Sequence, residues 1–249
     1  MINLRNISIS FNNIPILKKL SAHAKPGDFI MIVGANGSGK STLFDLIAGK
    51  KRAHEGQIII DEQNVTSLDE LARAPLIARL FQNTDLSCVP TMTVAQNIAL
   101  TKLKARAAGF THCMNNLSNE TLQEIAQTME IDLKTILEKQ MGSLSGGQRQ
   151  VVSLITATLV PPKILLLDEP TAALDPIAAT KLLIFARKFI DKHKITTLMI
   201  THDPHLALCL GNKLWILEEG IIKQEFGPEK NMLSPNHLIG SIDYQRLQN

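Results

Sequence analysis

Gly34-Ala-Asn-Gly-Ser-Gly-Lys-Ser41 follows directly on Phe29-Ile-Met-Ile-Val33, and these two stretches decide the fold. The first fits the phosphate-loop pattern G-x-x-x-x-G-K-[S/T] at every position. The second is an unbroken apolar run, which is typical of a strand buried on both faces. A helix is expected to start at about Ser41 and to end before Gly49. A buried strand, a glycine-rich loop and a helix in this order predict a nucleotide-binding site.

The residue types in this loop suit a chain of phosphates. Its glycines let backbone N–H groups converge on the β-phosphate, and the following helix adds the positive end of its dipole. Lys40 supplies a positive charge to the β- and γ-phosphates, and the Ser41 hydroxyl can bind Mg²⁺. A chance glycine-rich loop is the alternative, and the position between a strand and a helix argues against it. The predicted binding residues here are Gly34, Ala35, Asn36, Gly37, Ser38, Gly39, Lys40, Ser41 and Thr42.

A second apolar run ends in two carboxylates, because Ile164-Leu-Leu-Leu167 precedes Asp168 and Glu169. A buried strand would bring Asp168 to its carboxyl end, where the side chain can hold the hydration shell of Mg²⁺. Glu169 could then polarise an attacking water as a general base. Such a run is common when taken alone. Beside a phosphate loop it indicates a functional role.

Leu144-Ser-Gly-Gly-Gln148 lies between two helical segments. Ser145 and the two glycines present a hydroxyl and bare backbone N–H groups at the start of a helix, which makes a second anion site. An isolated pentapeptide of this composition would instead be read as a flexible Ser-Gly hinge. Its presence in a chain that also has a phosphate loop favours the anion site.

Together these residues resemble the nucleotide-binding subunit of ATP-binding cassette (ABC) transporters over almost the whole chain. The resemblance implies that Leu144 to Gln148 is the family signature, which caps the ATP bound by the opposite subunit. Ala173-Leu-Asp175 matches the loop that crosses the dimer interface. The implied ATP contacts of the signature are Ser145, Gly146, Gly147 and Gln148.

The same resemblance assigns three further site residues. Phe11 stands where the family has an aromatic residue, usually Tyr, that stacks on adenine, although a core position in the first strands is the alternative. Gln82 resembles the glutamine that touches Mg²⁺ and lies in the loop coupled to the membrane subunits. His202 matches the histidine that contacts the γ-phosphate. The resemblance thus implies Glu169, His202 and Lys40 as catalytic residues and Ser41, Gln82 and Asp168 as metal ligands.

One departure from the family pattern points to a particular subgroup of the family. After the signature most relatives carry an Arg within Ala-Arg-Ala-Leu, whereas this chain has Ser153-Leu-Ile-Thr-Ala-Thr-Leu159. That variant resembles a bacterial subgroup linked to the uptake of aromatic amino acids or related solutes. The alternatives are an exporter, a lipid-transport ATPase and a soluble cassette ATPase of translation or DNA repair. Such soluble ATPases usually carry two cassettes, a long coiled coil or zinc cysteines, and a non-hydrolysing module would lack Glu169 and His202.

The resemblance implies an ATP-hydrolysing subunit that uses ATP and Mg²⁺ and powers uptake of amino acids or related small solutes. Its implied partners are a second copy joined through an ATP sandwich, integral-membrane permease subunits and a solute-binding protein. The implied place is the cytoplasmic face of the inner membrane, as a peripheral subunit.

Composition argues against several other classes. The 249 residues are 45% hydrophobic and 20% charged, which is ordinary for a globular protein. Aromatics at 4% and a formal charge of +3 argue against a nucleic-acid partner. Cys88, Cys113 and Cys209 fit neither a zinc spacing nor a disulfide framework, so a reducing compartment is expected. Neither a membrane span nor a signal peptide is expected.

The expected fold is α/β: a P-loop NTPase (RecA-like) core with a mainly parallel sheet, an antiparallel β subdomain and an α-helical insertion. One domain is expected over residues 1–249, with the core at 1–82 and 159–249 and the helical subdomain at about 83–158. The first 30 residues are expected to form strands, because Ile2, Leu4, Ile7 and Ile9 are spaced mostly by two. Further strands are predicted at 57–61, 163–168 and 196–202, and residues 213–218 and 221–222 are expected to form a hairpin around the turn at Glu219 and Gly220. Helical periodicity predicts helices at 94–108, 119–137 and 177–192, with Asn119 as the cap of the second.

Overall fold

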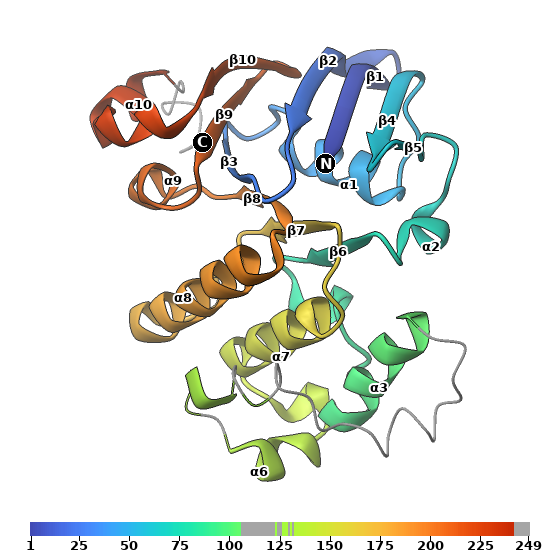
Figure 1. Ribbon diagram of the computed structural model, residues 1–249, viewed down its shortest axis with the longest axis vertical. Helices are drawn as coiled ribbons and strands as arrows, with labels where there is room; N and C mark the ends of the chain where they lie inside the picture. Colours follow the sequence, from blue (N-terminus) through green and yellow to red (C-terminus); the bar gives the residue numbers. More distant parts are fainter. Residues whose placement is uncertain (106–122, 124–125, 129, 131, 242–249) are drawn as a thin grey trace. The chain divides into compact units, whose positions relative to one another are not determined.

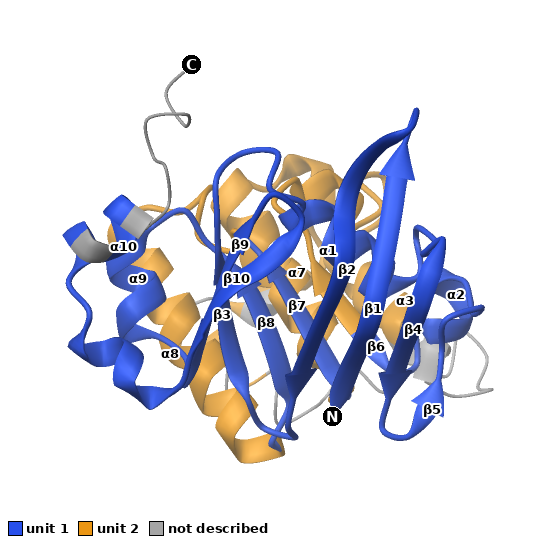
Figure 2. Cartoon of the chain, turned by 90° about the horizontal axis from the view of Figure 1, so that it is seen from above, with its two compact units in different colours: residues 1–77, 163–168, 194–249 blue, residues 78–162, 169–193 orange. Residues whose placement is uncertain are grey.

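The computed structural model describes residues 1–105, 123, 126–128, 130 and 132–241. The chain divides into two compact units, which Figure 2 colours separately. Unit 1 comprises residues 1–77, 163–168 and 194 onwards, and unit 2 comprises residues 78–162 and 169–193. The boundaries of the helical subdomain, about 83 and 158, stay a prediction.

Unit 1 contains an antiparallel sheet with the strand order β2-β1-β4-β5 (Figure 1). The alternating apolar residues of β1 are buried, as their spacing predicts: Ile2, Leu4, Ile7 and Ile9. The three-residue step between Leu4 and Ile7 coincides with a break in the pairing register, so the side chains return to the same face. The strands are β1 (Ile2–Phe11), β2 (Ile14–Ala24), β4 (Glu55–Ile60) and β5 (Gln63–Asn64).

The second sheet of unit 1 has the order β10-β9-β3-β8-β7. Its inner strands are β3 (Phe29–Val33), β7 (Ile164–Asp168), β8 (Thr196–Ile200) and β9 (Lys213–Glu218). The pairs β3–β8, β3–β9 and β7–β8 are parallel, and every residue of β3, β7 and β8 is buried. The predicted mainly parallel sheet of fully buried strands is therefore confirmed.

The antiparallel strand β10 (Ile221–Phe226) is longer than the predicted strand at 221–222. It pairs with β9 through the turn at Glu219 and Gly220. None of its residues is fully buried, and Lys223, Gln224 and Glu225 are exposed. The sequence shows no apolar pattern for these residues because they line an exposed edge of the sheet.

The core of unit 1 joins the two sheets through α1 (Lys40–Ala48). Leu43, Phe44 and Ile47 of this helix pack with apolar side chains from both sheets. Gly49 ends the helix in the left-handed conformation at φ 84°, as its position in the sequence predicts. The remaining helical elements of unit 1 are α2 (Glu70–Arg73), α9 (Pro204–Cys209), η3 (Pro228–Met232) and α10 (Pro235–Ser241).

Helices dominate the described part of unit 2 (Figure 1). In α8 (Pro176–His193), Leu182, Phe185 and Phe189 are buried, so the predicted helix and its apolar face are confirmed. The other elements are β6 (Ile77–Leu80), which begins at the unit boundary, η1 (Thr84–Leu86), α3 (Val94–Ala105), α6 (Leu133–Leu137), η2 (Met141–Ser143) and α7 (Gly146–Thr158).

Two of the helix predictions reach beyond the described residues. The helix predicted at 94–108 is confirmed up to Ala105, and residues 106–108 lie outside them. The helix predicted at 119–137 is seen in part, because Asn119, Leu122, Ile125 and Met129 lie outside the described residues as well. Across the ranges that the structure describes, no helix is both long and apolar enough to cross a membrane.

A buried arginine closes the carboxyl end of α1. Arg73 is 1% exposed, and its Nη1 donates to the carbonyl oxygens of Leu46 and Ile47 at 2.7 and 2.8 Å. Its Nε and Nη2 donate to the carbonyls of Leu68 and Thr66. Burial lowers the pKa of this guanidinium below its ordinary value. The arginine thereby satisfies helix-terminal carbonyls that lack partners within the helix.

Arg73→Met should lower the free energy of unfolding by about 1.5–3 kcal/mol, because buried carbonyl oxygens lose the hydrogen bonds that the guanidinium donates to them. Urea denaturation followed by circular dichroism measures this loss. Arg52→Met, which removes an exposed arginine nearby, is the control and should change the free energy by less than about 0.5 kcal/mol. Equal stabilities for the two variants would contradict this role for Arg73.

Candidate functional site

Three neighbouring parallel strands of unit 1 end at the same level. Ile32 of β3 pairs with Ile200 of β8, and Ile200 pairs in turn with Asp168 of β7. Gly34 and His202 each lie two residues beyond this level, at the carboxyl ends of their strands. The predicted phosphate loop, carboxylate and histidine are therefore carried by adjacent strand ends, where ligands of parallel sheets bind.

The loop from Gly34 to Gly39 is shaped by close backbone contacts. A side chain at Gly34 would overlap the carbonyl oxygen of Leu217 in β9, so only glycine fits this approach. Gly39 has φ 106° and precedes the first turn of α1. Ser38 accepts a hydrogen bond at its carbonyl oxygen from the Gly220 N–H at 3.1 Å. These contacts fix the loop at the start of the helix, as phosphate binding requires.

The ammonium group of Lys40 lies inside this loop. Lys40 is 7% exposed, and its Nζ donates to the carbonyl oxygens of Gly34 at 2.7 Å and Ala35 at 2.9 Å. The loop thus holds a positive charge beside its own backbone N–H groups. This arrangement attracts an anion with several negative oxygens.

Oxygen donors and a buried hydroxyl fit a metal-bound polyphosphate at this edge. Ser41 is exposed at the first turn of α1, and Asp168 is 9% exposed at the end of β7. The Ser38 hydroxyl is buried and has no hydrogen-bond partner among the described residues. Within those residues no cluster of three His, Cys, Asp or Glu side chains could hold a metal. Mg²⁺ in nucleotide sites takes few protein oxygens, so this donor set fits it.

Phe11, at the end of β1, is 40% exposed. The alternative that it is a core residue of the first strands is therefore wrong. The Nζ of Lys51 lies 4.8 Å from the centre of its ring, a contact for which the sequence carries no local signal. An exposed aromatic ring beside a cation is able to stack on a planar base.

In unit 2, Gln82 and Glu169 come together. Gln82 donates from Nε2 to Oε2 of Glu169 at 3.1 Å. Glu169 adopts φ 48°, in the left-handed region that a non-glycine residue rarely occupies. The covalent bond to Asp168 places this backbone at the end of β7. Strained backbone of this kind is found at functional sites, and the carboxylate of this residue is the one that accepts the hydrogen bond from Gln82.

The signature stretch forms the N-terminal end of α7. The Ser145 hydroxyl accepts from the Gln148 N–H at 3.2 Å, and the Gln148 Oε1 accepts from the Ser145 N–H at 3.1 Å. This reciprocal capping box leaves the serine proton able to donate elsewhere. A side chain at Gly147 would come within 3.0 Å of Leu174. A fixed helix start, rather than a flexible hinge, is what the structure shows at Ser145.

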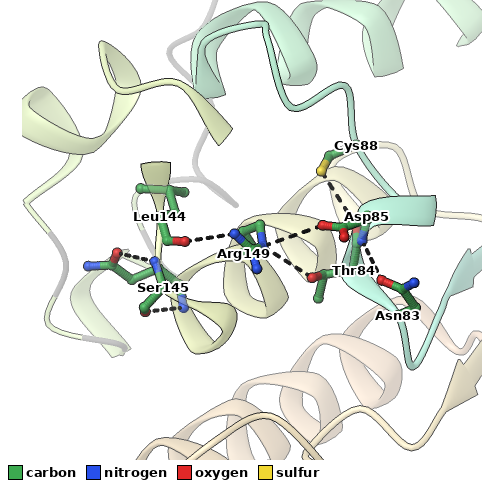
Figure 3. Close-up of polar contacts among 8 residues, drawn as sticks. Asn83, Thr84, Asp85, Cys88, Leu144, Ser145 and Arg149 are labelled. Atoms are coloured by element: carbon green, nitrogen blue, oxygen red, sulfur yellow. Dashed lines mark hydrogen bonds and ion pairs between the residues drawn. The ribbon is translucent and has the colours of Figure 1, made fainter. Parts of the chain in front are cut away.

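Arg149, which the sequence reasoning missed, joins the signature stretch to the residues after Gln82 (Figure 3). Its Nη1 donates to the carbonyl oxygen of Leu144 at 2.8 Å. On its other side, Nε donates to the Thr84 hydroxyl at 3.3 Å and lies 3.8 Å from Oδ1 of Asp85. The sequence signal was a cation directly after the motif, and two of its partners, Thr84 and Asp85, lie far away along the chain.

The structure therefore places the predicted residues in two groups. In unit 1 the phosphate loop, Asp168 and His202 share one sheet edge, and Phe11 lies at the end of β1 in the same unit. In unit 2 the signature stretch, Gln82 and Glu169 are found, with Gln82 bonded to Glu169 and Arg149 bonded to the signature.

Comparisons with known proteins find the same family that the motifs resemble. The family model described as ABC transporter matches residues 17–172. The chain is 36% identical over 250 residues to the tyrosine transport ATP-binding protein of Clostridioides difficile, covering 98% of this chain and 99% of that protein. It is 34% identical over 225 residues to the sulfate/thiosulfate import ATP-binding protein CysA of Mesostigma viride, covering 90% of this chain but 61% of that protein.

A solved structure shares the fold. The dimeric post-hydrolysis state of the ATP-binding cassette MJ0796, bound to ADP and Pi, aligns with a TM-score of 0.78. The two sequences are 27% identical, and the alignment covers 92% of this chain and 99% of that one. The expected fold class, a nucleotide-binding α/β core with an antiparallel subdomain and helices, is confirmed by this likeness.

Arg149→Met should increase amide hydrogen exchange in residues 83–88 and 144–148 about fivefold, because it removes charge-assisted hydrogen bonds to both stretches. Mass spectrometry of peptides from these stretches measures the change. Arg187→Met is the control, since it breaks an exposed pair with Asp191 on α8 and should leave both stretches unaltered. Unchanged exchange in Arg149→Met would show that the arginine does not hold the two stretches.

Proposed function

Because the chain belongs to the ABC transporter family, and is accordingly an ATPase that serves as the ATP-binding subunit of a transporter, we propose that it powers uptake of an amino acid or a related small solute. The likeness over 98% of the chain to a tyrosine transport ATP-binding protein supports this class of solute. The run from Ser153 to Leu159, where most relatives have an Arg, supports the same subgroup.

The observation that carries the proposal is the common level of three strand ends, which brings the phosphate loop, Asp168 and His202 to one edge. Backbone N–H groups of residues 34–42 bind the phosphates, and Lys40 neutralises the β- and γ-phosphates. Ser41, Asp168 and Gln82 would hold Mg²⁺. When bound, that ion neutralises phosphate charge and orients the oxygens.

Hydrolysis needs a base and a stabilised γ-phosphate. Glu169 accepts the proton of the attacking water, and the hydrogen bond from Gln82 holds one of its carboxylate oxygens. His202 donates to the γ-phosphate from the end of β8. Lys40 stabilises the charge that develops on the phosphate oxygens.

A second copy of the chain completes the proposed site. Ser145, Gly146, Gly147 and Gln148 cap the ATP bound by the other copy, with the first turn of α7 directed at the phosphates. The capping box supports this role because it fixes the loop before nucleotide arrives. The segment after Gln82 contacts permease subunits at the cytoplasmic face of the membrane, and a solute-binding protein delivers the solute. The dimeric form of a similar cassette supports this assembly.

Glu169→Gln keeps the size of the side chain but removes the base, so ATP should bind and not turn over. The purified variant should elute as a dimer with ATP and as a monomer with ADP, measured by size-exclusion chromatography with light scattering. Glu138→Gln, at an exposed position in unit 2, is the control and should hydrolyse ATP normally.

Adding Ser145→Arg to Glu169→Gln should abolish the dimer, because it puts bulk and charge at the second anion site. Turnover of ATP by Glu169→Gln at the normal rate would refute the role of Glu169 as the general base. Dimers of the double variant would refute the capping role of Ser145.

Lys40→Ala should weaken ATP binding about 10–150-fold, because it removes a charge-assisted phosphate contact worth roughly 1.5–3 kcal/mol. Cells in which this variant replaces the chain should lose accumulation of radiolabelled aromatic amino acids. Lys50→Ala removes an exposed lysine just beyond α1 and should retain both binding and uptake. Retained ATP binding in Lys40→Ala would contradict the assignment of the phosphate site. Lost ATP binding with retained uptake would contradict the proposal that this chain powers uptake of aromatic amino acids.

A further inference from the structure

The ring of Phe11 has one face covered by a cation. The Nζ of Lys51 lies 4.8 Å from the ring centroid, within the range of an attractive cation–π contact. The ring stands at the end of β1 next to a tight turn, in which Asn12 and Asn13 have φ of 49° and 63°. At 40% exposure much of the residue remains open to solvent.

Lys51 is itself held in place by Asp45. Its Nζ lies 2.9 Å from Oδ2 of Asp45, and its backbone N–H donates to the Asp45 carbonyl oxygen at 3.1 Å. The Asp45 side chain is 14% exposed, and that of Lys51 is 34% exposed. Two attachments to one residue restrict the ammonium to the space above the ring.

Asp45 belongs to α1, the helix whose first residue is Lys40. One short stretch of chain therefore carries the cation of the phosphate loop and the anchor of the cation on Phe11. A rigid helix sets the spacing between these two points.

We propose that Lys51 is a positioning residue for the base of ATP: anchored by Asp45, it holds the Phe11 ring so that the opposite face takes adenine. This inference rests on the proposed ATP site and on the stacking of adenine on Phe11 that the family resemblance implies. The ammonium fixes the ring orientation before nucleotide arrives, so less side-chain freedom is lost on binding. An ion pair that remains partly open to solvent contributes little to folding stability, so the effect of Lys51 is expected on the binding of the base.

The test compares the binding of two ligands by calorimetry: ATP with Mg²⁺, and inorganic tripolyphosphate with Mg²⁺, which has the phosphates without the base. Lys51→Met should weaken ATP about two- to fivefold and leave tripolyphosphate unchanged. Lys51→Arg should restore ATP binding, because a guanidinium also lies well over an aromatic ring. Lys50→Met makes the same charge change at an exposed neighbour and should bind both ligands normally.

Three results would overturn the inference. The first is normal ATP affinity in Lys51→Met while Phe11→Leu weakens ATP. The second is an equal loss for tripolyphosphate, which would mean that the ammonium acts on the phosphates directly. The third is a loss of ATP affinity from Lys51→Met that persists in full when Phe11 is already Leu, because the effect would then not pass through the ring.

The failure of the proposed stacking is separable from these results. Normal ATP affinity in Phe11→Leu would refute the base platform itself, and with it this role of Lys51. Thermal unfolding of every variant is measured alongside. Unfolding temperatures within about 2 °C of the unaltered protein confirm that the binding changes are local.

Discussion

The approach of the backbone at Gly34 to the carbonyl oxygen of Leu217 is the constraint on which the phosphate loop depends. The start of the loop packs so closely against β9 that a side chain at this position would overlap the strand. The turn after β9 reinforces this contact, since the Gly220 N–H donates to Ser38 and the Gly220 carbonyl accepts from the Lys18 N–H at 3.0 Å. A hairpin near the end of the chain thus supports both the loop and the second strand from the N-terminus.

Much of the fold can be predicted from local sequence, because the apolar runs and apolar periodicity of the major strands and helices indicate which of their residues are buried. The short apolar runs that end at Val33 and Leu167 are typical of strands buried on both faces, and the parallel pairing follows from the helices between them. The end of α1 was equally predictable, because Gly49 takes a conformation that other residues avoid. Only the first two residues of the exposed strand β10 were predicted, and the short helices were missed, since these segments lack an apolar period.

The site was predictable to the extent that its residues lie in contiguous motifs. The loop from Gly34, the carboxylate after β7 and the capped start of α7 are each read from neighbouring residues. Pairs that depend on tertiary contact could not be read in this way. The contact of Lys51 with Phe11, and those of Arg149 with Thr84 and Asp85, join residues that only the folded chain brings together.

The order of the strands in the second sheet bears on when this protein becomes able to bind its nucleotide. The phosphate loop directly follows β3, but β3 lies between β8 and β9, both of which come much later along the chain. Until those strands leave the ribosome, β3 has neither neighbour, and the surface against which Gly34 packs does not exist. Contacts so distant in sequence form slowly and leave apolar strands exposed meanwhile. The nascent chain therefore carries a complete phosphate-loop motif before β8 and β9 are made, and during that interval it has no binding site.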